Sequence, residues 1–259
     1  MAFGFTKLAL ALDCKGAKNN VTLAEDYICG DDRLGPIKYG TKAVMEGSPS
    51  ITARIMDCFL KDYDPLHDMK PVDFLQKFWD KNAQPKPTWR YPDYDGFEKD
   101  KTTGKYINSS TIVPSGSYLD RFGWTKGSFL AIAGTSYTRR SIPPDSLNPY
   151  PPYPLTSDNR FSNYHVYLVE KNFTANGGLI APWFGQNGYS GQLKIEGGDV
   201  QSLIDSKMIQ KVDPKTAWDN GAYGHCPGAP KPPPKKAPPP PQSQQKIDWS
   251  LHNFFPHIN

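Results

Sequence analysis

Two short runs of strand-forming residues flank a glycine-containing turn in the stretch Tyr118-Leu-Asp-Arg-Phe-Gly-Trp-Thr-Lys-Gly-Ser-Phe-Leu130. Such runs, apolar or alternating and bounded by glycine or proline, are typical of strands. The second run extends to residue 133, and similar runs occupy 164–169, 179–184 and 192–195. Residues 200–207 have a helical pattern, and residues 208–212 look like a closing strand. The sequence therefore predicts an α+β fold with a mainly antiparallel β core.

The region before this core has a different pattern. Apolar residues recur at helical spacing from Ser50 and again after Pro71, where proline suits the first turn of a helix. We expect two short helices that pack together in a small helical N-terminal region. We divide the chain into a signal-peptide remnant (1–12), an N-terminal helical, disulfide-linked region (13–104), a β domain (105–226), a proline-rich linker (227–246) and a C-terminal docking segment (247–259).

Cysteines and glycosylation motifs indicate the compartment. The four cysteines occur in no CxxC spacing, so their even number predicts two disulfides rather than a metal site. All three pairings are open, and we expect one bridge to tie the C-terminal cysteine to the N-terminal region. Together with three Asn-x-Ser/Thr motifs, this predicts a secreted glycoprotein. The cysteines are Cys14, Cys29, Cys58 and Cys226, and the motifs begin at Asn20, Asn108 and Asn172.

Charge and motif content exclude several functional classes. The formal charge of +4 is small and dispersed, which argues against a nucleic-acid partner. The chain has no run of about eighteen apolar residues, so no transmembrane segment is expected. It contains no Gly-x-Ser-x-Gly, Walker or His-Glu-x-x-His motif. The carboxylates at Asp62, Asp64 and Asp68, or at Asp93 and Asp95, could hold calcium, although solvated turn residues explain them better and no EF-hand spacing is present.

A second turn, after the 179–184 run, carries one amide side chain. The segment is Ile180-Ala-Pro-Trp-Phe-Gly-Gln-Asn-Gly188. Its glycines allow the backbone to approach a ligand closely, and Trp183 and Phe184 would form a stiff, desolvated floor. By itself this pattern fits a β-turn in which Gln186 caps its own backbone. The alternative is the wall of a ligand pocket.

Four ordered segments favour the pocket. They are the 118–130 stretch, Arg139-Arg-Ser-Ile-Pro-Pro-Asp-Ser-Leu147, Tyr164-His-Val-Tyr-Leu168 and Ala181-Pro-Trp-Phe-Gly-Gln186. Together they resemble the NAD glycohydrolase domain of the tuberculosis necrotizing toxin family, and they are most similar to the secreted fungal NADases that carry this domain. The resemblance covers residues 105–213, about half of the chain. An extra proline-rich stretch between Leu147 and Tyr164 departs from the bacterial pattern.

The resemblance implies an extracellular NAD(P)⁺ glycohydrolase that releases nicotinamide and ADP-ribose, with water as the acceptor. The nicotinamide leaves as a neutral molecule, so the reaction needs no general acid. It instead needs polar groups that hold an oxocarbenium-like transition state next to the diphosphate. The resemblance assigns the diphosphate contact to Arg121 and the key role in the cleavage step to Gln186. The alternative for Arg121 is a surface ion pair with Asp120.

Five further residues are predicted to bind substrate. Phe129 matches an aromatic residue of the family, and Phe122 could flank the nicotinamide or its ribose, although apolar strand residues are more often core. Arg140 and His165 lie in matching motifs, and a structural role explains His165 equally well. Trp183 completes this set.

The remaining predictions concern cofactors, partners and location. No cofactor is required, and calcium would be a structural or regulatory ion. A homodimer is expected from the apolar C-terminal segment, and the protein is expected outside the cell, on a spore or conidial surface. The alternatives are an ADP-ribosyl transferase or cyclase, for which Glu170 and Glu196 match no motif, and a non-catalytic surface or carbohydrate-binding module rich in tyrosine and tryptophan.

Overall fold

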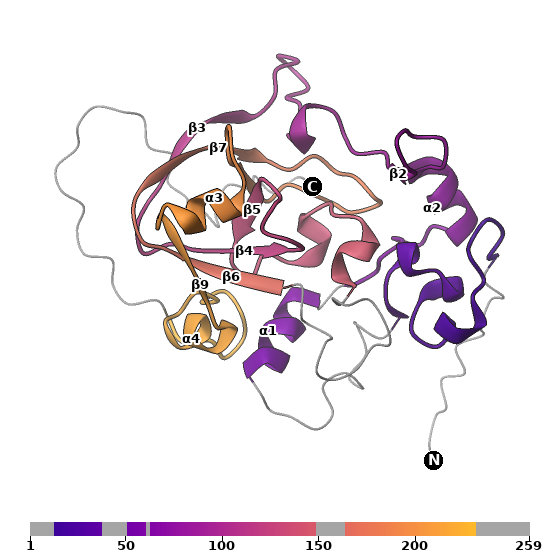
Figure 1. The fold of residues 1–259 in the computed structure, drawn as a ribbon, viewed down its shortest axis with the longest axis horizontal. Helices are drawn as coiled ribbons and strands as arrows, with labels where there is room; N and C mark the ends of the chain where they lie inside the picture. Colours follow the sequence, from indigo (N-terminus) through magenta and orange to yellow (C-terminus); the bar gives the residue numbers. More distant parts are fainter. Residues whose placement is uncertain (1–12, 38–50, 61–62, 149–163, 232–259) are drawn as a thin grey trace.

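The computed structural model describes residues 13–37, 51–60, 63–148 and 164–231 (Figure 1). The predicted signal-peptide remnant, Asp62, most of the proline-rich linker and the C-terminal docking segment lie outside the described residues. The fold is α+β, as the sequence predicts, with an antiparallel sheet at its centre and short helices around it. None of the helices in the described part of the chain combines the length and apolarity needed to cross a membrane.

The central sheet has seven strands in the order β3-β7-β8-β5-β4-β6-β9, and every neighbouring pair is antiparallel. In the β4–β6 pair, Arg121 lies opposite His165 and Phe122 lies opposite Tyr164. The strands are β3 (Asn108–Val113), β4 (Tyr118–Phe122), β5 (Phe129–Ile132), β6 (Tyr164–Val169), β7 (Phe173–Leu179), β8 (Gly191–Lys194) and β9 (Ile209–Val212).

The other elements are short. A two-stranded sheet pairs β1 (Trp79–Asp80) with β2 (Thr88–Trp89). The α-helices are α1 (Ile51–Leu60), α2 (Pro71–Phe78), α3 (Val200–Asp205) and α4 (Pro214–Asp219). The 3₁₀ turns are η1 (Val21–Leu23), η2 (Ile28–Gly30), η3 (Asp32–Leu34), η6 (Tyr94–Gly96), η7 (Tyr137–Arg139) and η8 (Pro144–Leu147).

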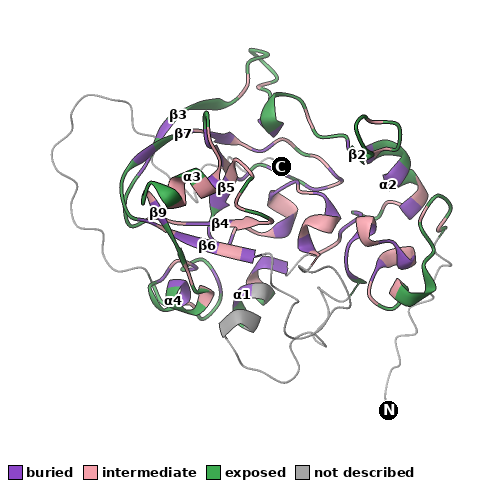
Figure 2. Cartoon of the chain, viewed as in Figure 1, coloured by how far each residue is buried: buried purple, intermediate pink, exposed green. Residues whose placement is uncertain are grey.

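The central sheet buries both of its faces, because Val166 and its neighbour Tyr167 in β6 point to opposite sides and both are buried (Figure 2). Val166 packs on one face with α1 and α4, where Phe59 of α1 is 1% exposed. Tyr167 faces the opposite cluster, which Val200 of α3 joins. Each fully buried large side chain contributes about 1.5–3 kcal/mol to folding.

A third cluster joins the N-terminal segment to the sheet region. It contains Phe74 and Phe78 of α2, Trp89 of β2, Leu34 of η3 and Phe184 from the loop after β7. Figure 1 shows α2 and β2 at one end of the molecule, away from α1 and α4. The prediction that α1 and α2 pack together is therefore wrong. The two helices pack in different clusters, α1 against the sheet and α2 against the loop that carries Gln186.

The predicted strand at 179–184 is also wrong. Strand β7 ends at Leu179, and the backbone then turns, because Pro182 has no N–H to donate and Phe184 and Gly185 adopt positive φ angles of 50° and 72°. The other predicted strands are present within one or two residues of their expected bounds. Strand β3 and most of β7 were not predicted.

Both predicted disulfides are present. Cys14 pairs with Cys29 inside the N-terminal segment, and Cys58 of α1 pairs with Cys226 beyond α4. The second bridge spans 168 residues and ties the N-terminal region to the end of the β domain, as expected. Disulfides of this kind persist in oxidising compartments.

Candidate active site

The loop of residues 180–190 is held by contacts on all sides. Its centre is a tight turn in which the Gln186 N–H donates to the Trp183 carbonyl at 2.8 Å. Both central residues of this turn have positive φ, as in a type I′ turn. The Trp183 indole N–H donates to the Arg90 carbonyl at 2.7 Å, and the Ala181 N–H donates to the Gly96 carbonyl at 2.8 Å. The loop conformation is therefore fixed by chain segments far away in sequence.

Gln186 is 2% exposed, and one end of its amide is fixed. Its Nε2 donates to the backbone carbonyl of Asp64 at 2.8 Å. Since only the NH₂ end can donate to a carbonyl, this contact orients the amide. The other end, Oε1, is buried and has no hydrogen-bond partner among the described residues. A buried acceptor without a partner is costly, which marks Oε1 as a group kept for a ligand.

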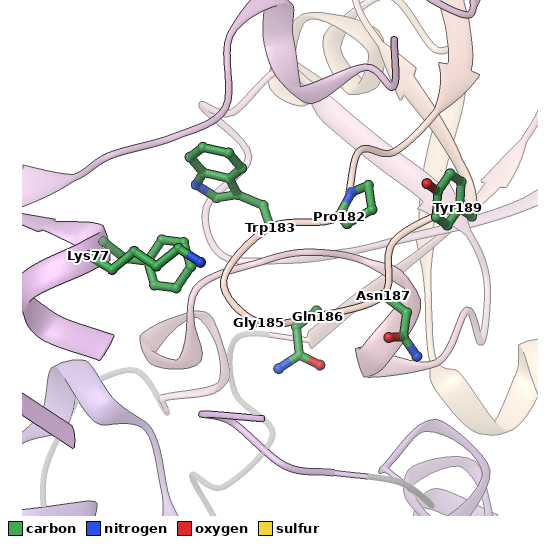
Figure 3. Close-up of a pocket in the computed structure, with 8 residues that line it drawn as sticks. Lys77, Pro182, Trp183, Gly185, Gln186, Asn187 and Tyr189 are labelled. Atoms are coloured by element: carbon green, nitrogen blue, oxygen red, sulfur yellow. The ribbon is translucent and has the colours of Figure 1, made fainter. Parts of the chain in front are cut away.

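A cavity of about 610 Å³ lies beside this loop (Figure 3). In Figure 3 the side chains of Trp183 and Gln186 leave the loop in different directions, and Lys77 of α2 extends toward the loop from the other side. The cavity lining consists of Lys77, Phe78, Pro182, Trp183, Gly185, Gln186, Asn187 and Tyr189. It therefore includes two of the predicted site residues, Gln186 and Trp183, and it does not include Arg121.

Arg121 is held by the hairpin to which it belongs. Its Nε donates to the Trp124 carbonyl and its Nη1 to the Phe129 carbonyl, both at 2.8 Å. Its Nη2 lies against Gly127, where a Cβ atom would be 1.8 Å away, and has no hydrogen-bond partner in the described ranges. Burial lowers the pKa of Arg121, but the guanidinium stays charged. A rigid, partly desolvated cation with a free N–H is suited to an anionic ligand.

Asp120 does not pair with Arg121; it pairs with Arg140. The Asp120–Arg140 ion pair is buried, with Nη1–Oδ1 and Nη2–Oδ2 distances of 2.7 Å. Oδ2 also accepts from the Gly134 N–H and the Tyr164 hydroxyl. Arg140 is 5% exposed, and its Nε donates to the Thr135 carbonyl. The structure thus places Arg140, predicted to bind substrate, in the interior, where it supports the hairpin.

The remaining predicted site residues lie around the β4–β5 hairpin. Phe122 packs on Phe59 and Tyr164, with ring centroids 5.0 and 5.1 Å apart. Phe129 is half-buried at the start of β5, and its carbonyl anchors Arg121. His165 lies opposite Arg121, and burial, Lys211 and Arg121 together lower its pKa to about 4. The imidazole is therefore neutral at pH 7.

Two further residues near the Gln186 loop, Tyr91 and Asp145, were not singled out by the sequence. The Tyr91 ring contacts Phe184 edge-on at 5.7 Å, and its hydroxyl is within electrostatic reach of Arg121 and Asp145. The Asp145 carboxylate accepts from the Trp89 indole N–H at 2.8 Å, and burial raises its pKa to about 6. Asp145 belongs to a motif that pointed only to Arg140, and Tyr91 lies before every matching motif.

Two of the candidate calcium ligands, Asp64 and Asp95, have carboxylates with partners in the protein. The Asp64 carboxylate accepts from the backbone N–H groups of Leu66, His67 and Asp68, which closes the turn beneath Gln186. Asp95 pairs with Lys194 at 2.7 Å.

The three asparagines of the glycosylation motifs are all exposed.

Comparison with known proteins adds the family. A family model described as Tuberculosis necrotizing toxin matches residues 112–212. Over 195 residues the chain is 35% identical to the conidial surface nicotinamide adenine dinucleotide glycohydrolase nadA of Aspergillus fumigatus, and the match covers 74% of both proteins.

Two solved structures are more distant. The tuberculosis necrotizing toxin complexed with its immunity factor IFT matches at 19% identity and a TM-score of 0.42, over 55% of this chain and 71% of its own. Rhs1-CT in complex with its cognate immunity protein RhsI1 matches at 14% identity and a TM-score of 0.27, over 47% of this chain and 83% of its own. By the identity and coverage of the fungal relative, and by the matching family model, this chain belongs to the tuberculosis necrotizing toxin family.

Proposed function

We propose that this protein is an NAD⁺ glycohydrolase, a hydrolase of N-glycosyl compounds that cleaves the bond between nicotinamide and ribose. The observation that carries the proposal is a pair of polar side chains at the candidate site. Each is fixed by hydrogen bonds and keeps one unpartnered polar atom, and we call them the prepared groups. Arg121 offers a fixed N–H on a partly desolvated cation, and Gln186 offers a fixed, unpartnered carbonyl oxygen. The related fungal protein is a conidial surface NAD glycohydrolase, which supports the same reaction here.

The reaction needs little from the protein beyond these groups. When the glycosidic bond breaks, its electron pair goes to the nicotinamide nitrogen, and the cationic ring leaves as neutral nicotinamide. The ribose becomes an oxocarbenium-like cation, water adds to its C1′, and the water then loses a proton to the solvent. The products are nicotinamide, ADP-ribose and H⁺. No cofactor takes part in this balance.

Arg121 and Gln186 then act on different parts of the substrate. The Arg121 Nη2 would bind a diphosphate oxygen, where a charge-assisted hydrogen bond is about twice as strong as a neutral one. The Gln186 Oε1 would face the nicotinamide ribose and stabilise its developing positive charge. Because the Asp64 carbonyl already holds Nε2, the Gln186 dipole needs no reorientation during the reaction.

The finer predictions belong to the same proposal. Two disulfides and three exposed Asn-x-Ser/Thr motifs support a secreted, glycosylated protein, and the fungal relative supports a location on the cell surface. We also propose NADP⁺ as a substrate and a homodimer as the assembly state. A structural or regulatory calcium ion stays a prediction, which activity measured with EDTA and with added calcium tests.

A time course of the purified protein with NAD⁺, resolved by chromatography, tests the function. We expect nicotinamide and linear ADP-ribose in equal amounts, formed at least about 10²-fold more slowly by the Gln186→Ala protein. Cyclic ADP-ribose or ADP-ribosylated protein in place of free ADP-ribose would instead identify a cyclase or transferase. Intact NAD⁺ after prolonged incubation would contradict the proposed function.

A further inference from the structure

Tyr91 differs from the other exposed tyrosines of the described residues. It is 59% exposed, and its hydroxyl has no hydrogen-bond partner in the part of the chain that the structure describes. Tyr94 is 67% exposed, but it stacks on Tyr106 with ring centroids 3.9 Å apart. Tyr189 is 36% exposed and donates to Glu98. Tyr189 belongs to the Gln186 loop itself, whereas Tyr91 contacts that loop from the N-terminal region with its ring accessible and its hydroxyl not engaged by Glu98 or another described residue.

The backbone before Tyr91 is fixed from two directions. The Arg90 N–H donates to the Phe78 carbonyl of α2, and the Arg90 carbonyl accepts from the Trp183 indole, each at 2.7 Å. The Tyr91 ring then meets the fully buried Phe184 edge-on at 5.7 Å. An exposed ring on such a support loses little conformational entropy when a ligand binds, which suits it to recognition.

The electrostatic surroundings of Tyr91 include Asp145 and Arg121. Burial raises the pKa of Tyr91 to about 12, the Asp145 carboxylate contributes in the same direction, and Arg121 lowers it. Phe184 is two residues before Gln186, so Tyr91 contacts the Gln186 loop, and its hydroxyl lies within electrostatic reach of Arg121.

We propose that Tyr91 is a substrate-binding residue whose exposed ring, supported by Phe184 beside the Gln186 loop, contacts the nicotinamide riboside half of NAD⁺. This inference rests on the proposed function. Tyr91 lies outside residues 112–212, so the N-terminal region supplies part of the substrate site in addition to supporting it. Because Tyr91 contacts the substrate before and during bond cleavage alike, its loss weakens binding more than the chemical step.

Four variants test this inference: Tyr91→Ala, Tyr91→Leu, Tyr91→Phe and the control Tyr94→Ala. Steady-state kinetics with NAD⁺ should show KM raised at least tenfold in Tyr91→Ala and Tyr91→Leu, with kcat within threefold of the wild type. Tyr91→Phe keeps the ring and should stay within threefold in KM. Tyr94→Ala should match the wild type. Unchanged KM in both ring-removing variants, or a loss of kcat alone, would overturn the inference.

A binding measurement separates this inference from the proposed function. Calorimetry with NAD⁺ is made on the Gln186→Ala protein and on Gln186→Ala combined with Tyr91→Leu, so that turnover does not interfere. We expect Kd to rise at least tenfold in the double variant. An equal Kd overturns the Tyr91 inference even if the wild type hydrolyses NAD⁺. An inactive wild type whose Gln186→Ala form loses NAD⁺ affinity on Tyr91→Leu would overturn only the proposed function.

Discussion

The β4–β5 hairpin and the 180–190 loop each carry one prepared group, but they hold it in different ways. Arg121 is anchored by carbonyls three and eight residues further along the same hairpin. Gln186 is anchored by Asp64, which is 122 residues away, and Trp183 by Arg90, which is 93 residues away. The hairpin is a local unit, whereas the loop depends on the N-terminal region. The family model covers the hairpin and the loop but not Asp64 and Arg90, which anchor Gln186 and Trp183.

The largest effect on the hairpin is expected from Arg121→Ala. Removing the guanidinium removes the charge and the free Nη2 donor, so kcat/KM should fall by about 10³-fold or more. Arg121→Lys is the matched control, since it keeps the charge but cannot make both carbonyl contacts, and it should recover only part of the loss. If the Arg121→Ala protein kept the wild-type kcat/KM, Arg121 would not be a substrate-binding residue.

Gly127→Ala tests whether the hairpin positions Arg121 locally. A Cβ atom at residue 127 would lie 1.8 Å from Nη2, so the guanidinium must move. A displacement of about 1 Å can cost about 10²-fold in rate. The control is the double variant with Arg121→Ala. If Gly127 acts through Arg121, the double variant will be no worse than Arg121→Ala alone, and additive losses would contradict this.

Asp64→Ala tests the long-range support of the loop. The carboxylate closes the turn whose carbonyl holds Gln186, so its loss should let the amide rotate and reduce kcat about tenfold, with little change in KM. Asp95→Ala removes another exposed turn carboxylate and serves as the control. Equal kinetics in the two variants would show that the Asp64 turn does not position Gln186.

The smallest effect on catalysis is expected at the Trp89–Asp145 contact between the N-terminal segment and the β domain, where the predicted change is in stability. Burial raises the pKa of Asp145 from 3.8 to about 6, so the protonated carboxyl is favoured in the folded protein. The raised pKa therefore contributes about 3 kcal/mol to the free energy of unfolding. This contribution is fully present below pH 3.8 and is lost as the pH rises from 3.8 through 6.

The Asp145→Asn protein isolates this contribution. Denaturant unfolding of both proteins between pH 4 and pH 7, with disulfides intact, gives the difference in the free energy of unfolding. The substituted amide can still accept from the Trp89 indole through its oxygen, but it does not titrate. We expect the wild type to lose stability relative to the variant as the pH rises, and parallel curves would contradict the raised pKa.

The sequence predicted the parts of the fold that are encoded locally. Strands β4 and β6 have the bounds predicted from alternating runs, and α1 and α2 follow their helical spacing. Strand β3 was missed because its first residues are polar. Most of β7 was missed because Gly177 and Gly178 look like turn residues, although they permit close pairing with β3. A Cβ at either position would clash with Thr111 or Ile107.

The site was predictable only to the level of its motifs. Arg121 and Arg140 both lie in matching segments, and no local pattern distinguishes a free guanidinium from one that is buried against Asp120. The contact between Gln186 and Asp64, and the placement of Tyr91 beside Phe184, arise from chain segments about 90 to 120 residues apart. Such contacts depend on the packing of the third cluster around Phe184.

Gln186→Ala tests the central claim most directly, because it removes Oε1, a buried acceptor of the candidate site that has no partner among the described residues. The measurement is turnover of NAD⁺ together with calorimetric binding of NAD⁺ to the same protein. We predict that kcat falls by at least about 10²-fold while Kd stays within threefold, since the lost contact acts mainly in the transition state. Wild-type turnover in this variant, or loss of both binding and turnover, would contradict that role for Gln186.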